Sequence, residues 1–225
     1  MYTMFFTITM LASMALTSPT PLPSPVSPRA APQASDILLA IAPSSSSCAN
    51  APAAGECATA AQAAEYLIPA MAKYEIYNPH EIVAVLSVIA YESGEFKYNT
   101  NHFPAPGRPG QGTRNMQMPN FNLIYAQSIP ELKTQLAAIT TATSTSGLSD
   151  ATLNAIRALV LPDQYSWASG AWYLTTQCSS VRTQLQAGGV AGWNAYMACI
   201  GATDSSETAA RLAYWTAANT AFGIS

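Results

Sequence analysis

Apolar residues recur at helical spacing through most of the chain, and no segment sustains the alternation of apolar and polar residues typical of a strand. The most apolar run is EIVAVLSVIAYE at residues 81–92, which carries its large aliphatic side chains at helical spacing. A helix that is apolar on almost every side is buried on every side. The pattern therefore predicts a buried central helix that ends on Glu92.

The residues before this run predict where the helix begins. Asn78 can cap the helix, and Pro79 suits its first position because that residue needs no backbone donor. Glu81 stands where a capping box places its carboxylate. We therefore expect the central helix to start within NPHE, residues 78–81.

The same spacing predicts further helices at residues 57–73, 150–160, 165–178, 188–200 and 205–222. Ser149 precedes one of them as a candidate cap, and PDQ at 162–164 precedes another. Residues 99–121 are rich in Gly, Pro and Asn, which favours an irregular loop after the central helix. The expected fold class is all-α, with a buried central helix and an irregular Gly/Pro-rich loop.

The first 44 residues differ from the rest. Residues 4–16 are apolar but too short to span a bilayer, which favours a secretory signal at 1–18 over a membrane anchor. Residues 19–44 are rich in Pro and Ser and are expected to form a linker or propeptide. A single catalytic domain is then expected over residues 45–225, secreted and without membrane contact after signal cleavage.

The charge balance of the chain argues against a nucleic-acid partner. Lys and Arg total 9, Asp and Glu total 12, and the net charge is −3. A nucleic-acid-binding surface needs clustered Lys and Arg, so no nucleic acid is expected as a partner. We expect a monomer without a cofactor.

Four cysteines follow the expected signal: Cys48, Cys57, Cys178 and Cys199. An even count in a secreted protein favours disulfides, and three pairings are possible. We favour Cys48–Cys57 and Cys178–Cys199 because each closes a short loop beside a predicted helix. The cysteine spacing and the two histidines do not suit a metal site, so none is expected.

Glu92 is the candidate for chemistry. Burial disfavours its charged form, and the negative end of the helix dipole acts in the same direction. Both raise the carboxyl pKa, as a general acid near neutral pH requires. The alternative is a solvent-facing Glu92 on the last helical turn. Gly94 lets the chain leave the helix immediately afterwards.

The downstream loop favours the first interpretation. Glu92-Ser93 at the end of an apolar helix, followed by a glycine-rich loop that closes on Met116-Gln117, resembles the lytic transglycosylases and goose-type lysozymes of the lysozyme superfamily (family 23 glycoside hydrolases). The resemblance covers roughly residues 80–120, and elsewhere only the helical outline. Arg114-Asn115 stands where that family has Gly-Leu. The proline-rich leader and the cysteine pairs resemble a secreted fungal member.

The resemblance implies a lysozyme-like fold and an antibacterial hydrolase or lytic transglycosylase that cleaves peptidoglycan, with Glu92 as the single general acid and base. It implies substrate contacts from Ser93, Met116 and Gln117, and we add Arg114 and Tyr173 as candidates; Arg114 could equally brace the loop. No second catalytic carboxylate is identified, because Asp150, Asp163 and Asp204 stand at predicted helix starts where capping is the simpler role.

Two alternatives remain open. A related enzyme could cleave chitin or chitosan, and a secreted carbohydrate-binding effector could keep the fold without catalysis. The net charge of −3 weakens the peptidoglycan interpretation, since bacterial walls are anionic. Glu92 weakens the non-catalytic interpretation, since a binding protein gains nothing from a carboxylate in so apolar a setting.

Overall fold

The computed structural model describes residues 33–224, and within this range the protein is helical with no strand, which confirms the expected all-α class. The expected signal and most of the expected linker lie outside the described residues. The helices in chain order are α1 (Ala34–Ile41), α2 (Ala60–Lys73), α3 (Pro79–Glu92), α4 (Pro119–Ser128), α5 (Lys133–Ile139), α6 (Asp150–Val160), α7 (Asp163–Ser166), α8 (Ser169–Thr176), α9 (Arg182–Gln186), α10 (Gly189–Cys199) and α11 (Ser205–Phe222). Three short 3₁₀ turns join them at Pro43–Ser46, Pro130–Leu132 and Ser179–Val181.

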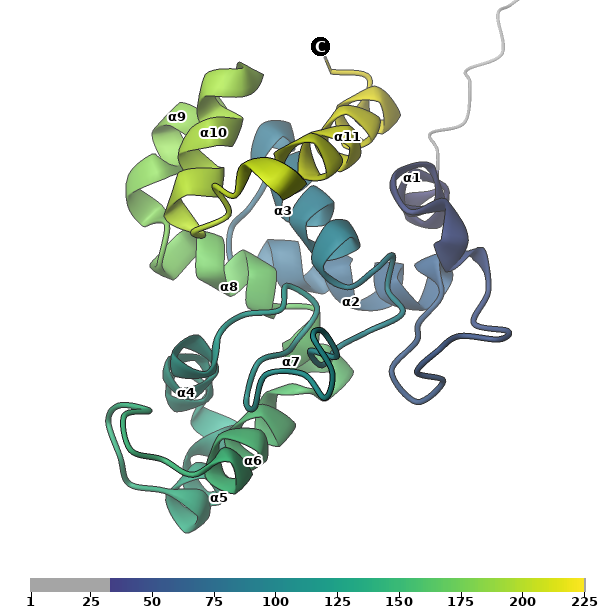
Figure 1. The fold of residues 1–225 in the computed structure, drawn as a ribbon. Helices are drawn as coiled ribbons and strands as arrows, with labels where there is room; N and C mark the ends of the chain where they lie inside the picture. The colour runs from purple at the N-terminus through teal and green to yellow at the C-terminus, as the bar shows by residue number, and fades with distance from the viewer. Residues whose placement is uncertain (1–32, 225) are drawn as a thin grey trace, which may run out of the picture. The chain divides into compact units, whose positions relative to one another are not determined.

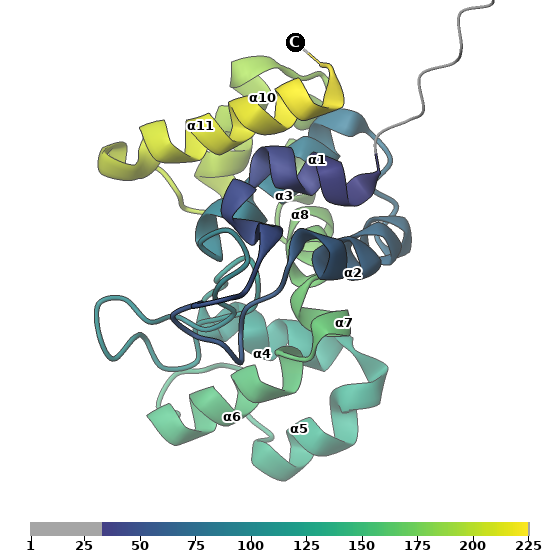
Figure 2. The same ribbon diagram turned by 90° about the vertical axis from the view of Figure 1, so that its right-hand side faces the viewer.

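Helix α3 is the central element, as its sequence predicts. Val83, Ala84, Val85, Ile89 and Ala90 have no exposed side-chain surface. Figure 1 shows α3 between α11 and α2, and Figure 2 shows α1 lying across the same region. Helices α4, α5 and α6 form a separate group, seen in the lower part of both views. The end of α3 therefore lies between the two groups, beside the loop that connects them.

Of the two predictions about the start of α3, the Asn78 cap is confirmed and the Glu81 capping box is wrong. Asn78 caps the helix by accepting a hydrogen bond from the backbone N–H of His80 at 2.9 Å. Glu81 does not complete a capping box: its carboxylate is 1% exposed and accepts the Arg182 Nε–H at 2.6 Å. The acid thus joins α3 to α9, because a buried carboxylate is stabilised better by a charged donor than by one backbone N–H.

The amino end of the fold differs from the expected linker. Residues 34–41 form α1, and Leu38 and Ile41 are buried in the core at 3% and 2% exposure. The stretch SDILLAI alone has the apolar spacing of a helix, although the prolines around it favour a linker. The folded unit thus begins at least eleven residues before the expected boundary at residue 45.

Both favoured disulfides are confirmed. Cys48 pairs with Cys57, and Cys178 pairs with Cys199. The second bridge joins Cys178, two residues after α8 ends at Thr176, to Cys199, the last residue of α10. It therefore fixes two helices that contribute aromatic side chains to the pocket described next.

Candidate functional site

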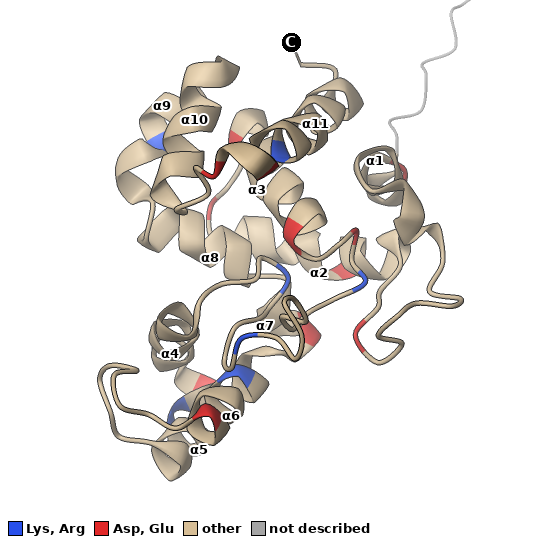
Figure 3. Cartoon of the chain, in the orientation of Figure 1, with Lys and Arg blue, Asp and Glu red and all other residues tan. Residues whose placement is uncertain are grey.

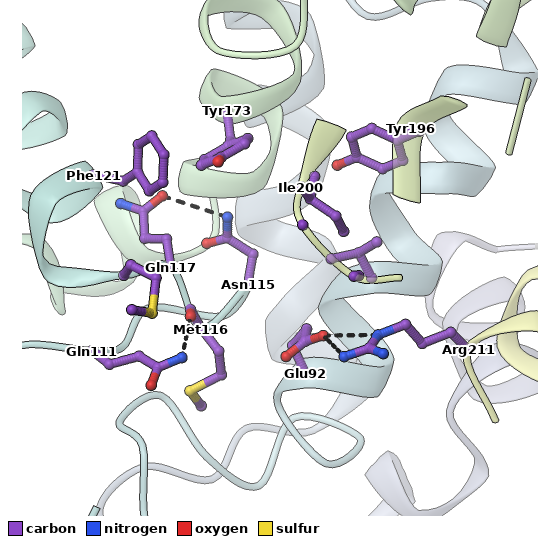
Figure 4. Close-up of a pocket in the computed structure, with 14 residues that line it drawn as sticks. Glu92, Gln111, Asn115, Met116, Gln117, Phe121, Tyr173, Tyr196, Ile200 and Arg211 are labelled. Atoms are coloured by element: carbon purple, nitrogen blue, oxygen red, sulfur yellow. Dashed lines mark hydrogen bonds and ion pairs between the residues drawn. The ribbon is translucent and has the colours of Figure 1, made fainter. Parts of the chain in front are cut away.

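A pocket with a volume of about 220 Å³ opens where α3 ends. Its walls come from α3, the loop of residues 99–118, α4, α8, α10, the turn of residues 200–202 and the first half of α11 (Figure 4). The side chains that matter for chemistry are Glu92, Asn115, Gln117, Tyr173, Tyr196 and Arg211. Among the residues that line the pocket, the charged ones are Glu92 and Arg211. Along the cartoon of the described chain, positions of Lys, Arg, Asp and Glu are scattered over many elements (Figure 3).

Glu92 lies in the wall of this pocket with a side chain that is 22% exposed. The structure thus places the acid predicted from the sequence in a pocket rather than on an open helix end. Burial raises the pKa of this carboxyl, and the neighbouring charge of Arg211 offsets only part of the effect. A carboxyl group in this setting can hold a proton at a higher pH than an exposed glutamate.

Arg211 on α11 is the partner of Glu92. Its Nε and Nη2 both donate to Oε1 of Glu92, each at 3.2 Å. Nη2 also lies 2.7 Å from a carboxylate oxygen of Glu207, one turn earlier on the same helix. The guanidinium stacks on the ring of Tyr91 at 4.7 Å. Glu92 is therefore one of two acids that share a single, 9% exposed arginine.

The opposite wall is a loop held by amide side chains. Asn115 donates to Oε1 of Gln117 at 3.4 Å (Figure 4). Gln117 in turn donates to Asn122 at 2.7 Å. Gln111 donates to the backbone oxygen of Met116 at 2.9 Å. Gly112 permits this path, because a Cβ there would lie 2.7 Å from the backbone oxygen of Asn99. The loop therefore presents neutral, oriented amides to the pocket.

Aromatic side chains from two helices complete the lining. Tyr173 of α8 packs edge-on against Phe121 of α4, with ring centroids 4.7 Å apart. Tyr196 of α10 is 1% exposed and also lines the pocket. Of the candidates predicted as substrate contacts, the structure brings Met116, Gln117 and Tyr173 together around Glu92.

Ser93 and Arg114 do not face this pocket. Ser93 is fully buried: it donates to the backbone oxygen of Ile89 at 2.6 Å and accepts the N–H of Phe96 at 2.9 Å, so it shapes the helix exit. Arg114 is 2% exposed, stacks on Trp167 at 4.3 Å and donates to two backbone oxygens. Of the two roles considered for Arg114, bracing the loop is the one that the contacts support.

Of the three aspartates considered as second acids, only Asp204 caps a helix, so the capping role expected of Asp150 and Asp163 is wrong. Asp204 caps α11, accepting the N–H of Ser206 at 2.8 Å. Asp163 accepts the indole N–H of Trp167 at 2.9 Å and lies 3.8 Å from Arg114. Asp150 is the first residue of α6, which Ser149 caps. None of the three lines the pocket of Glu92.

Sequence reasoning missed Arg211, Asn115 and Tyr196. The spacing of Glu207 and Arg211, four residues apart on a predicted helix, indicates an ion pair but not a third partner. Tyr196 stands in an apolar helix where a core role is the simplest expectation. The link between Glu92 and Arg211 spans 119 residues and is visible only in the folded chain.

Between residues 33 and 224 no three His, Cys, Asp or Glu side chains are grouped so that they could hold a metal ion. Over the same residues no helix combines the length and the apolar character needed to cross a membrane.

The chain is similar in sequence to a known protein. The chain is 44% identical over 161 residues to a bifunctional dioxygenase–epoxy alcohol synthase of Fusarium oxysporum (strain Fo5176). The match covers 71% of this chain but only 12% of that protein, so the chain spans about an eighth of its relative's length. No family model and no solved structure matches the chain.

This match contradicts the function expected from the sequence. The relative is named for a dioxygenase and an epoxy alcohol synthase, and neither activity cleaves a glycan. We therefore withdraw the glycosidase and lytic transglycosylase activities, the peptidoglycan, chitin and chitosan substrates, and the polysaccharide-binding effector. The lysozyme-superfamily resemblance of residues 80–120 stays a prediction about the fold, and a fold does not by itself determine activity.

Proposed function

We propose that the chain is a proton-transfer enzyme in which Glu92 is the general acid and base, acting on an oxygen atom of an uncharged ligand. The observation that carries this proposal is the state of the Glu92 carboxyl group. It lies in a pocket wall, Arg211 holds only one of its oxygens, and burial raises its pKa.

The lining of the pocket supports an uncharged ligand. Its charged side chains are Glu92 and Arg211, which already pair with each other. A charged ligand would compete with that pair. Asn115, Gln117 and Gln111 offer neutral donors and acceptors, and Tyr173 offers an aromatic surface. These groups suit a small molecule with hydroxyl or epoxide oxygens and an apolar body.

The relative's name supports the same chemical class. An epoxy alcohol carries an epoxide and a hydroxyl oxygen, and a carboxylic acid can protonate either. Protonation of an epoxide oxygen weakens its C–O bond, so that water can attack the carbon. The ring oxygen keeps the proton from Glu92, the attacking water returns one proton to the carboxylate, and the epoxide becomes a vicinal diol, so that an epoxy alcohol becomes a triol. No oxidant is needed for this step.

The test uses styrene oxide as the probe and the Glu92→Gln variant. The amide keeps the shape of the side chain but has no proton to donate, so hydrolysis should fall by roughly 10²–10⁴-fold. Folding should persist, because Arg211 keeps Glu207 as its partner. Glu65→Gln, on the exposed side of α2, is the matched control and should keep full activity.

Two results would count against the proposal. Equal hydrolysis by folded wild type and Glu92→Gln would remove Glu92 from the reaction. No hydrolysis by wild type, together with a Glu92 carboxyl group that titrates as an ordinary exposed glutamate in ¹³C NMR, would remove the acid–base site altogether.

We further propose that the helical fold is lysozyme-like and that the protein is secreted. Support for the fold is the arrangement of Glu92 at the end of a buried helix, opposite a loop that carries Met116 and Gln117. Support for secretion is the pair of disulfides, which persist in oxidising compartments. A crystal structure superposed on a goose-type lysozyme tests the fold, and recovery of the protein from the culture medium tests secretion.

A further inference from the structure

Glu92 is held asymmetrically. Both hydrogen bonds from Arg211 reach Oε1, and no hydrogen bond within residues 33–224 involves Oε2. A carboxyl group is protonated most readily on the oxygen that is not already accepting from a cation. The free oxygen is thus the one that carries the proton and meets a ligand in the pocket.

Arg211 is itself fixed from several sides. Tyr91 lies under the guanidinium, and the Tyr91 ring packs edge-on against Tyr214 with centroids 5.9 Å apart. The Tyr214 hydroxyl donates to Glu95 at 2.9 Å, and Glu95 also accepts the Ser44 hydroxyl at 2.6 Å. The arginine is therefore anchored to α3 through Tyr91, and α11 is anchored to the segment after α1 through Glu95.

Glu207 competes with Glu92 for the same guanidinium. Its oxygen lies closer to Nη2, at 2.7 Å, than does that of Glu92, at 3.2 Å. The Glu207 side chain is 50% exposed, whereas that of Glu92 is 22% exposed. The Arg211 guanidinium is thus shared with an acid outside the pocket, which leaves Glu92 incompletely neutralised.

We infer that Arg211 is a positioning residue, which fixes Oε1 of Glu92 and leaves Oε2 to the ligand, while Glu207 limits how strongly it does so. This inference rests on the proposed proton transfer at Glu92. It gives the two α11 residues opposite effects: Arg211 favours the carboxylate of Glu92, and Glu207 favours its protonated form.

Apart from Arg211 and Glu207, no described titratable group that faces Glu92 carries a charge that would favour or disfavour its carboxylate. The titratable groups that face it are Tyr91 on its own helix, Tyr173 on α8 and Tyr196 on α10. Burial raises the pKa of all three phenols, so they stay uncharged over the acidic range in which a carboxyl titrates. The loop and α4 present to the pocket only uncharged side chains: Gln111, Asn115, Met116, Gln117, Met118 and Phe121.

The experiment follows the ¹³C carboxyl resonance of Glu92 against pH in the full chain, assigned by its loss in Glu92→Gln. Arg211→Gln should move the titration midpoint to higher pH, because a cation that favours the carboxylate is lost. Glu207→Gln should move it to lower pH, because a competing and repelling acid is lost. Arg211→Lys should stay closer to wild type than Arg211→Gln does.

Lys133→Gln on α5 and Glu65→Gln on α2 make the same changes of net charge at exposed positions away from the pocket and should leave the midpoint unchanged. If Arg211→Gln does not fold, Arg211→Lys and Glu207→Gln decide. An unmoved midpoint, or shifts in the same direction for both α11 sites, overturns the inference. A wild-type midpoint at the ordinary glutamate value overturns the proposed function instead.

Discussion

Glu92 is the last residue of α3, and Glu56, which precedes α2, contacts the loop that follows α3. The surroundings of these two acids shift their pKa values in opposite directions. Burial raises the pKa of Glu92 more than Arg211 lowers it. Burial also acts on Glu56, but hydrogen bonds from Asn99 and Thr100 outweigh it and lower its pKa. Glu56 accepts the N–H groups of Asn99 at 2.8 Å and Thr100 at 2.9 Å. One acid is suited to holding a proton, and the other anchors the loop.

Glu56→Gln is expected to destabilise the protein by about 1–2 kcal/mol at neutral pH, because bonds to a charged acceptor become bonds to a neutral one. The folded pKa of Glu56 lies below its ordinary value of 4.5, so its stabilisation is present above 4.5 and is lost as pH falls through the folded value. Urea unfolding from pH 7 down to acidic pH measures the difference. A difference that stays constant at all pH values would contradict the prediction.

At the scale of elements, most helices could be predicted because local signals specify them. Ser149 caps α6, Asn78 caps α3, and α11 spans the expected residues 205–222. Helix α2 begins at Ala60 rather than at Cys57, because Thr59 and Gln62 form a capping box there. The expected helix at 165–178 starts earlier and is interrupted between Ser166 and Ser169. The predicted helix boundaries were wrong where two possible helix starts lie within a few residues of each other.

The bridge Cys178–Cys199 joins the ends of helices that carry Tyr173 and Tyr196. The two cysteines are separated by 21 residues, so the double variant C178A/C199A should lose roughly 3 kcal/mol of unfolding free energy, by the loop-entropy relation. C48A/C57A, with a separation of 9, is the matched comparison and should lose less. Guanidinium unfolding of both variants gives the comparison, and a larger loss in C48A/C57A would refute the ordering.

At the scale of the whole molecule, the site depends on contacts between segments far apart in the chain. Glu92 could be predicted because an acid at the end of an apolar helix is anomalous in sequence. Arg211 could not, since its role arises only when α11 packs beside α3, as Figure 1 shows. The substrate could not be predicted either. A motif of a few residues can indicate a fold, but what a pocket binds depends on the side chains of all its walls.

The amino-terminal residues of the fold help to hold α3 and α11 in place around the site. Helix α1 buries Leu38 and Ile41 at 3% and 2% exposure. After it, both the N–H and the hydroxyl of Ser44 donate to Glu95 at 2.6 Å. Tyr214 of α11 donates to the other oxygen of Glu95. Residues 34–44 thus hold the exit of α3 and the middle of α11 in place.

A chain that starts at residue 45 should therefore be less stable than one that starts at residue 33. Burial of two large aliphatic side chains is worth roughly 3–6 kcal/mol, and the truncation also removes both donors from Ser44 to Glu95. We expect a clear fall in Tm by calorimetry, and a Glu92 midpoint that differs between the two chains because α11 loses one of its anchors. Leu38→Ala in the longer chain separates packing from length: it should produce part of the loss, about 2–5 kcal/mol. Equal Tm values for the two chains would contradict the prediction and show that α1 adds nothing to the stability of the fold.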